Sequence, residues 1–367
     1  MHGDDETAAL YTAARSADLP AFQHAVLDLW ERVGEAADVL DRIVPLFAMV
    51  PPAVSGQLAL GSVRAYRLGA PEGGLVEAVA DGLRRALTDA LAFADAWQKL
   101  AGRNTALPVP GDDGQGQFNH AVVTLSRDRR WPRKALAADD AARYAGAWFL
   151  LDDWMSAASG LLVLRDVRAD LPHRGELTGL VRRLDALRPD MFCLAGLLDV
   201  LDDEPLIVVH RDQRRAFRLR ISGVGDNFQL HTLIADALSR DALIADIVPD
   251  PDWVAAATTG PPDACDRTRA LFQLTDGDGM AVPIDGRPAL IPLHRGRRVV
   301  VMDPPAYGRS WDLGRTYEDM VPQVRLEEVL GPEGVGSVAG PIKRPGPQLS
   351  HAHYERRIGR VSLMYQT

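Results

Sequence analysis

A glycine-containing turn within residues 216–238 holds the side chains best suited to chemistry in this sequence. The segment AFRLRISGVGDNFQLHTLIADAL is typical of a strand, a turn and a helix, with His231 one turn into the helix. An enzyme needs at least two titratable groups within reach of each other. Histidine titrates near neutral pH, and Asp226 is the nearest carboxylate along the chain. We therefore take His231 and Asp226 as the candidate catalytic residues.

The same turn is a candidate binding site for an anion. Gly223 and Gly225 let backbone amides approach a ligand, and Asn227 lies at the start of a helix, where negative charge is favoured. Arg218 and Arg220 alternate with apolar residues, so they project from the polar face of the strand and suit a phosphate or a carboxylate. We expect these five residues to bind a small anionic ligand.

A purely structural interpretation of the turn competes with this one. Asp226 or Asn227 is a natural N-cap for the helix that follows. His231 lies on the shoulder of an apolar stripe, where a histidine most often marks the boundary of the core and makes one hydrogen bond. If Gly225 forms the turn, we expect it to adopt a positive φ.

Motifs for a nucleotide or a metal ion are incomplete. The turn lacks the third glycine of the dinucleotide-binding fingerprint, and no acidic ribose partner is evident. Imidazole and carboxylate groups suit zinc or iron, but no spacing brings the available ones together. These groups are His210, His231, His294 and Asp226. The sequence therefore assigns no metal site and leaves the cofactor unknown.

Two acidic motifs match metal-binding sequences only in part. Asp152 and Asp153, in FLLDDWMS, resemble the start of the aspartate-rich magnesium motif of terpene synthases, but the third acidic position is absent. The segment TDGDG at 275–279 lacks the remaining ligands of a calcium loop and is more typical of a hairpin turn. Cys193 and Cys265 lie outside any CxxC pair, which excludes a zinc ribbon or a disulfide framework.

The elements that must position these residues change in character near residue 202. The first 201 residues read as amphipathic helices, for example at 18–34 and 75–97, with a polar loop at 102–117. Helix pairs recur at a spacing of roughly 35 residues, which resembles HEAT or tetratricopeptide repeats, although no repeat signature aligns. We predict an all-α domain over 1–201, either a helical bundle or a set of α-solenoid-like helix pairs.

The second half of the chain reads as a mixture of strands and helices. LIVVH and AFRLRIS are typical of two hairpin strands, and a helix follows them. Four short strands of a meander are then predicted, at 270–275, 280–284, 289–294 and 298–303, with turns between them. One more strand is predicted at 323–330. We predict an α+β domain over 202–340 with a mostly antiparallel sheet, followed by a Pro-rich basic tail over 341–367. The fold class of the whole chain is then α+β.

Composition narrows the classes of partner and compartment. The chain has 367 residues and a net charge of −9, which makes nucleic acid an unlikely main partner. The basic run RDRRWPRK at 127–134 is expected to be solvated surface. The N-terminus does not read as a signal peptide, and the longest apolar stretch, at 43–54, is too short to span a bilayer. We expect a soluble, cytoplasmic protein with no membrane attachment.

Two classes of function fit these observations best. The first is a binding or scaffold protein that uses a helical-pair surface and the α+β domain to engage a protein or peptide partner. The alternative is an enzyme of an unfamiliar family, acting on a small anionic or peptide substrate at the Gly223–His231 corner, for example in a specialised biosynthetic pathway. The absence of a complete catalytic motif favours the binding protein, and the sequence leaves open whether the chain is an enzyme.

Overall fold

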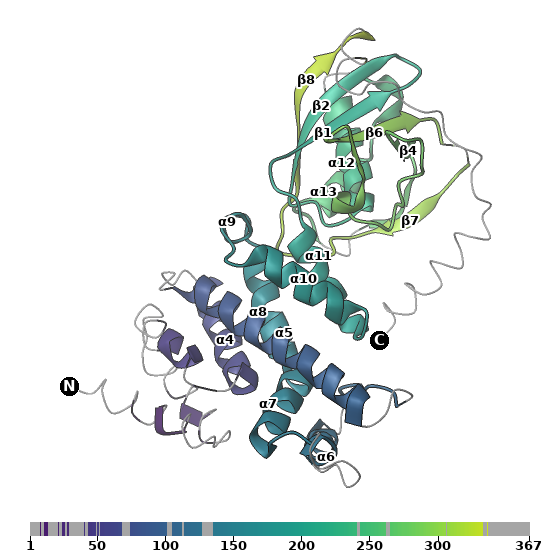
Figure 1. Cartoon of the computed structure of the whole chain (residues 1–367). Helices are drawn as coiled ribbons and strands as arrows, with labels where there is room; N and C mark the ends of the chain where they lie inside the picture. Colours follow the sequence, from purple (N-terminus) through teal and green to yellow (C-terminus); the bar gives the residue numbers. More distant parts are fainter. Residues whose placement is uncertain are drawn as a thin grey trace. The chain divides into compact units, whose positions relative to one another are not determined.

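The computed structural model divides the chain into two compact units, Met1–Asp199 and Val200–Thr367 (Figure 1). The sequence places the change of character between residues 201 and 202. The basic run at 127–134 and the tail at 341–367 lie outside the residues that the structure describes. The described residues are 8, 11–13, 21, 24, 25, 28, 40, 43–48, 50, 52–67, 74–100, 105–111, 114–126, 135–240, 243–261, 265–305, 307–332 and 336.

Helices make up the regular structure of the first unit in its described part. In chain order they are η1 (Val44–Ala48), α4 (Pro52–Arg67), α5 (Leu75–Leu100), α6 (Gly114–Ser126), α7 (Ala138–Phe149), α8 (Leu151–Leu162), α9 (Arg165–Ala169), α10 (Arg174–Asp185), η3 (Pro189–Met191) and α11 (Phe192–Asp199). The long helix α5 contacts α4, α6, α7, α8 and α10. Because a solenoid repeat contacts only its neighbours along the chain, this arrangement is a bundle around α5 rather than a solenoid.

Close packing of aromatic rings explains why α5 can lie at the centre of this bundle. A Cβ atom at Gly82 would come within 1.9 Å of the indole ring of Trp154 on α8, so the glycine makes room for that ring. Phe93 stacks on Trp97 and on Trp148 of α7, with ring centroids 5.7 Å and 5.2 Å apart. The pair of Phe93 with Trp148 adds to the burial of apolar area and fixes α5 against α7, while Gly82 lets α8 pack closely through Trp154.

In its described residues, the second unit combines a six-stranded sheet and a two-stranded sheet, β3-β7, with the helices α12 and α13. Its elements are β1 (Glu204–His210), β2 (Arg215–Ser222), α12 (Asn227–Ser239), η4 (Ala245–Ile247), α13 (Pro251–Ala257), β3 (Cys265–Arg269), β4 (Gln273–Asp276), η5 (Pro288–Leu290), β5 (Leu293–His294), β6 (Arg297–Asp303), β7 (Ser310–Leu313) and β8 (Gln323–Leu330). Helices lie mainly in the first unit and the sheet lies in the second, so the predicted α+β fold class is confirmed.

The main sheet has the order β4-β6-β1-β2-β8, with β5 also paired to β6. β1 and β6 are parallel, and the other pairs are antiparallel. The expected meander of four strands over 270–303 is wrong in part, because β4 pairs directly with β6 rather than with a strand at 280–284. Of the strand expected at 280–284, the bridge from Thr275 to Ala281 remains. Pro283 lies in that segment and has no N–H to donate to a sheet.

Apolar and charged side chains alternate along β2 and point to opposite faces of the sheet. Phe217, Leu219 and Ile221 are fully buried and pack in one cluster with Leu230 and Ile234 of α12. Successive side chains of a strand point to opposite faces, so Arg218 and Arg220 lie on the face away from α12, whereas Arg215 shares the face of Phe217. The sequence pattern predicted this separation, and the helix that covers the apolar face is visible in Figure 1.

Candidate functional site

The backbone amides at the start of α12, which the sequence predicted to bind an anion, already donate hydrogen bonds to other groups of the chain. Asp226 is the N-cap of α12, and its Oδ1 accepts a hydrogen bond from the amide of Gln229 at 2.8 Å. The amide of Asn227 donates to the carbonyl oxygen of Gly286 at 2.8 Å. The amide of Gly225 donates to Oε1 of Gln229 at 2.9 Å. Because these donors are used internally, they present no ready site for a ligand.

The side chains of Asp226 and Asn227 also make hydrogen bonds within the chain, although Oδ1 of Asn227 has no partner among the described residues. Oγ1 of Thr316 donates to Oδ2 of Asp226 at 2.6 Å. Burial raises the pKa of Asp226, while its hydrogen bonds from Thr316 and Gln229 oppose the rise. Nδ2 of Asn227 donates to the carbonyl oxygen of Pro283 at 2.7 Å. The two residues therefore hold the start of α12 in place.

The turn depends on a different glycine from the one expected. Gly223 has a φ of +65°, and its amide donates to the carbonyl oxygen of Leu201 at 3.0 Å. The expectation of a positive φ at Gly225 is wrong. Gly225 is instead favoured by space, because a Cβ atom there would lie 3.2 Å from both Gln229 Oε1 and the ring of Tyr317.

His231 lies inside the core, and the expectation of a boundary position is wrong. Its exposed fraction is 2%. The imidazole stacks on Phe272 with centroids 4.1 Å apart and meets the edge of Trp311 at 5.2 Å. Nε2 lies 3.2 Å from the carbonyl oxygen of Phe272 and 3.3 Å from the amide nitrogen of Leu271, so either neutral tautomer has a backbone partner.

This environment keeps the imidazole of His231 neutral. Burial lowers its pKa to about 4, against a partial opposing effect of the hydrogen bond with Phe272. No hydrogen bond joins Asp226 to His231 in the part of the chain that the structure describes. The geometry thus gives no support to an acid–base pair, and the catalytic roles of His231 and Asp226 stay predictions.

Arg218 and Arg220 line an open cleft on the sheet face away from α12. The cleft has a volume of about 310 Å³. Its charged lining residues are Glu204, Arg218, Arg220, Arg297 and Arg298. We call it the arginine cleft. The two arginines that the sequence singled out are therefore brought together with two more from β6, but not with the glycine corner.

Carboxylates of the chain already bind these arginines. Arg218 Nη1 lies 2.7 Å from Glu328 Oε2. Arg220 binds both oxygens of Glu327 through Nε and Nη2, the latter at 3.2 Å. The hydrogen bond from Arg220 lowers the pKa of Glu327. Across the cleft, Arg298 Nε lies 3.3 Å from Glu204 Oε1. The geometry of each pair matches the known preference of guanidinium for carboxylate.

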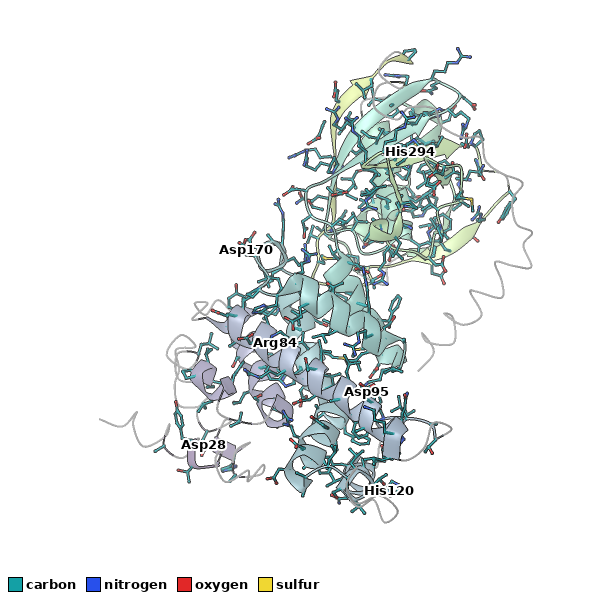
Figure 2. The ribbon with its side chains drawn as sticks, in the orientation of Figure 1. Asp28, Arg84, Asp95, His120, Asp170 and His294 are labelled. Atoms are coloured by element: carbon teal, nitrogen blue, oxygen red, sulfur yellow. The ribbon has the colours of Figure 1, made fainter. Side chains whose placement is uncertain are left out.

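Asp152, Asp276 and His294 each contact other groups of the chain. Arg188 binds Asp152 at 3.1 Å, which occupies one carboxylate of the FLLDDWMS motif. In TDGDG, Oδ1 of Asp276 accepts hydrogen bonds from the amides of Asp278 and Met280, so the segment is a tight turn, as expected. His294, labelled in Figure 2, lies on β5 with Nδ1 3.8 Å from Asp278. Within the described residues, no group of three or more His, Cys, Asp or Glu side chains suits a metal ion.

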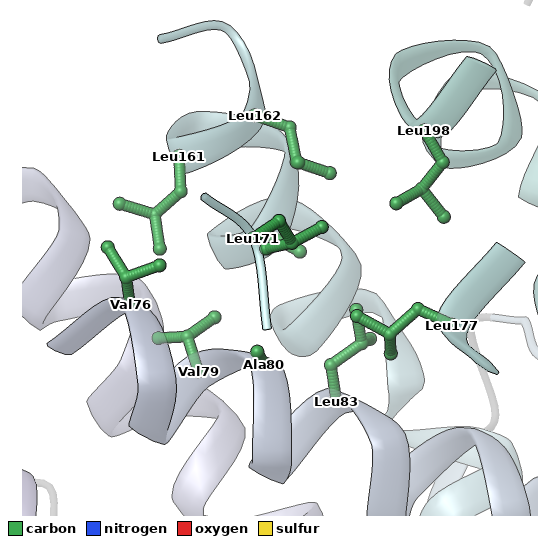
Figure 3. A pocket seen from close by; sticks show the side chains of 10 residues that line it. Val76, Val79, Ala80, Leu83, Leu161, Leu162, Leu171, Leu177 and Leu198 are labelled. Carbon is green, nitrogen blue, oxygen red and sulfur yellow. The ribbon is translucent and has the colours of Figure 1, made fainter. Parts of the chain in front are cut away.

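A second cavity, in the first unit, is too small for a ligand. Figure 3 shows leucine, valine and alanine side chains of α5, α8, α10 and α11 around it. Its volume is about 10 Å³, which is close to that of a single water probe. It is therefore a packing gap between helices.

Partial burial raises the pKa of the Cys193 thiol, away from the range of a nucleophilic cysteine.

Comparison with known proteins gives no functional lead: no family model, no curated protein and no solved structure matches the chain. None of the helices in the described ranges is both long enough and apolar enough to cross a lipid bilayer.

Sequence reasoning missed five charged residues of the site and its neighbourhood, the first of which is Glu204 at the start of β1. Arg297 and Arg298 begin β6, and their approach to β2 depends on a pairing between distant segments. Glu327 and Glu328 interrupt the alternation of QVRLEEVL, in which an apolar residue would be expected at one of the two positions. That interruption is the sequence signal that points to an irregular strand.

Proposed function

We propose that this chain is a binding protein whose C-terminal unit recognises a carboxylate-rich segment of a protein or peptide in the arginine cleft. The observation that carries the proposal is the lining of one open cleft by Arg218, Arg220 and Arg297. Arg298 also lines the cleft, but it is buried and donates to the carbonyl oxygens of Ala289 and Ile291. Arginine presents a planar fork of donors that binds a carboxylate through two hydrogen bonds, so it recognises both charge and shape.

The ion pairs within the cleft support the choice of a carboxylate as the recognised group. Glu204, Glu327 and Glu328 each bind one of the arginines at hydrogen-bond distance or close to it. A partner's glutamate or aspartate side chain would present the same group in the same geometry. The net charge of −9 argues against nucleic acid as the anionic partner.

The shape of the cleft supports an extended segment over a small enclosed substrate. A volume of about 310 Å³ is near the lower limit for small-molecule pockets, which bury most of their ligand. The cleft lies on an open sheet face, over adjacent strands β6, β1 and β2. The alternative, an enzyme with its site at the Gly223–His231 corner, receives less support because the polar groups there bind one another.

Binding of a labelled hexaglutamate peptide, measured by fluorescence anisotropy, tests the proposal. We expect the wild-type protein to bind this peptide, to ignore hexalysine, and to bind more weakly as salt rises. Because Arg218 and Arg220 are partly exposed, loss of each ion pair with the ligand should cost about 1 kcal/mol, so the double variant R218Q/R220Q should weaken binding about tenfold.

Arg182→Gln is the matched control, because Arg182 also forms an exposed ion pair, with Asp199 at 3.0 Å, but lies in the first unit. Its affinity should equal that of the wild type. Equal affinity of R218Q/R220Q and wild type, with both folded by circular dichroism, would reject the arginine cleft as the binding site.

A further inference from the structure

A β-bulge in the edge strand β8 sets the position of two adjacent glutamates. Along the antiparallel β2–β8 pair, Leu219 lies opposite Leu326, but the preceding residue of β2, Arg218, lies opposite Glu328. Glu327 is therefore the extra residue of the bulge. A bulge of this kind lets two residues of one strand oppose a single residue of its partner.

The bulge moves Glu328 to the opposite face of the sheet from the one that it would occupy in a regular strand. In a regular strand Glu327 would lie opposite Arg218, and Glu328 would lie opposite Phe217 on the face covered by α12. With the extra residue, Glu328 shares the face of Arg218, and Glu327 still reaches Arg220. Both carboxylates therefore lie on the face of the arginine cleft.

The two resulting ion pairs remain open to solvent. The side chains of Arg218 and Glu328 are 38% and 45% exposed, and those of Arg220 and Glu327 are 32% and 23% exposed. Ion pairs of such exposure contribute little to stability, because water and salt compensate the loss of either partner. A ligand carboxylate can therefore take the place of either glutamate at a small cost.

We propose that Glu327 and Glu328 are built-in competitors, which occupy Arg218 and Arg220 until an acidic partner displaces them. This inference rests on the proposed function and adds the selectivity of the same site. A ligand with one carboxylate only exchanges one ion pair for another and gains little. A segment with several carboxylates gains from the second contact once the first is made, because the second is then intramolecular. The cleft thus selects polyacidic segments over single carboxylates.

The double variant E327Q/E328Q tests this competition. Glutamine keeps the size of the side chain and removes the charge. We expect hexaglutamate to bind the double variant about tenfold more tightly than wild type, and each single variant about threefold more tightly. A peptide with one glutamate, acetyl-Gly-Glu-Gly-amide, should gain measurable affinity in the double variant. Glu318→Gln, an exposed change outside the cleft lining, should leave both affinities unchanged.

The possible outcomes separate this inference from the proposed function. If wild type binds hexaglutamate and E327Q/E328Q binds it no more tightly, the competition is rejected and the binding site stands. If only the double variant binds, the competition is supported in its strongest form. If neither protein binds, both proposals fail. Should the double variant prove unfolded by circular dichroism, the single variants decide the question in the same way.

Discussion

Replacement of His231 by alanine is expected to lower the free energy of unfolding by about 3–5 kcal/mol, the usual cost of truncating a buried aromatic side chain. The imidazole is 2% exposed, stacks on Phe272 and meets the edge of Trp311. The substitution leaves a cavity, removes both ring contacts and deprives the backbone at residues 271–272 of a hydrogen-bond partner.

Protonation of His231 gives this prediction a second, independent signature. Its pKa is about 4 in the folded protein against an ordinary value of 6.5. Between these values the unfolded chain binds a proton that the folded chain does not, so the free energy of unfolding falls as the pH falls. A difference of this size corresponds to about 3 kcal/mol, fully present above pH 6.5 and lost by pH 4.

Urea denaturation at a series of pH values, followed by tryptophan fluorescence, measures both effects. The variant H231F keeps an aromatic ring in place but cannot titrate, so it should lose about 1–3 kcal/mol at neutral pH and show a weaker dependence on pH than wild type. A loss below about 1 kcal/mol for H231A, or an unchanged pH dependence in H231F, would refute a buried neutral imidazole at this position.

Two further substitutions test how the two units are built. Gly82→Ala should destabilise the protein by about 1–3 kcal/mol because its Cβ atom would overlap the buried ring of Trp154, even though alanine is the better helix former; a stabilised variant in a thermal melt would contradict the packing described. Asp226→Ala should cost about 1 kcal/mol through loss of the N-cap, and Asp226→Asn should cost less because Oδ1 can still accept from Gln229. Equal losses in urea denaturation would show that the cap is not what Asp226 supplies.

Local patterns in the sequence predicted the parts of the fold that depend on neighbouring residues. The strict alternation of AFRLRIS assigned Arg218 and Arg220 to one face of a strand, and the structure places both in the same cleft. The sequence predicted an N-cap at Asp226 or Asn227, and in the structure Asp226 is the N-cap. Both features are set by the period of a strand and by the donors at a helix start, so no distant contact is needed to infer them.

Features that depend on contacts between distant segments could not be predicted from the sequence. His231 is buried because Phe272 and Trp311, from later parts of the chain, close over it, and no pattern within α12 reveals them. The insertion of β6 between β4 and β1 likewise depends on a pairing across the sheet. That insertion brings Arg297 and Arg298 to the cleft, which explains why half of its arginines could not be predicted.

Hydrogen–deuterium exchange with and without hexaglutamate tests the location of the binding site most directly. Binding in the arginine cleft predicts slower amide exchange in β8 and in the turn around Gly296, with no change across residues 223–231. Slower exchange across residues 223–231, with β8 and the turn unchanged, would place the ligand at the glycine corner and contradict binding in the arginine cleft.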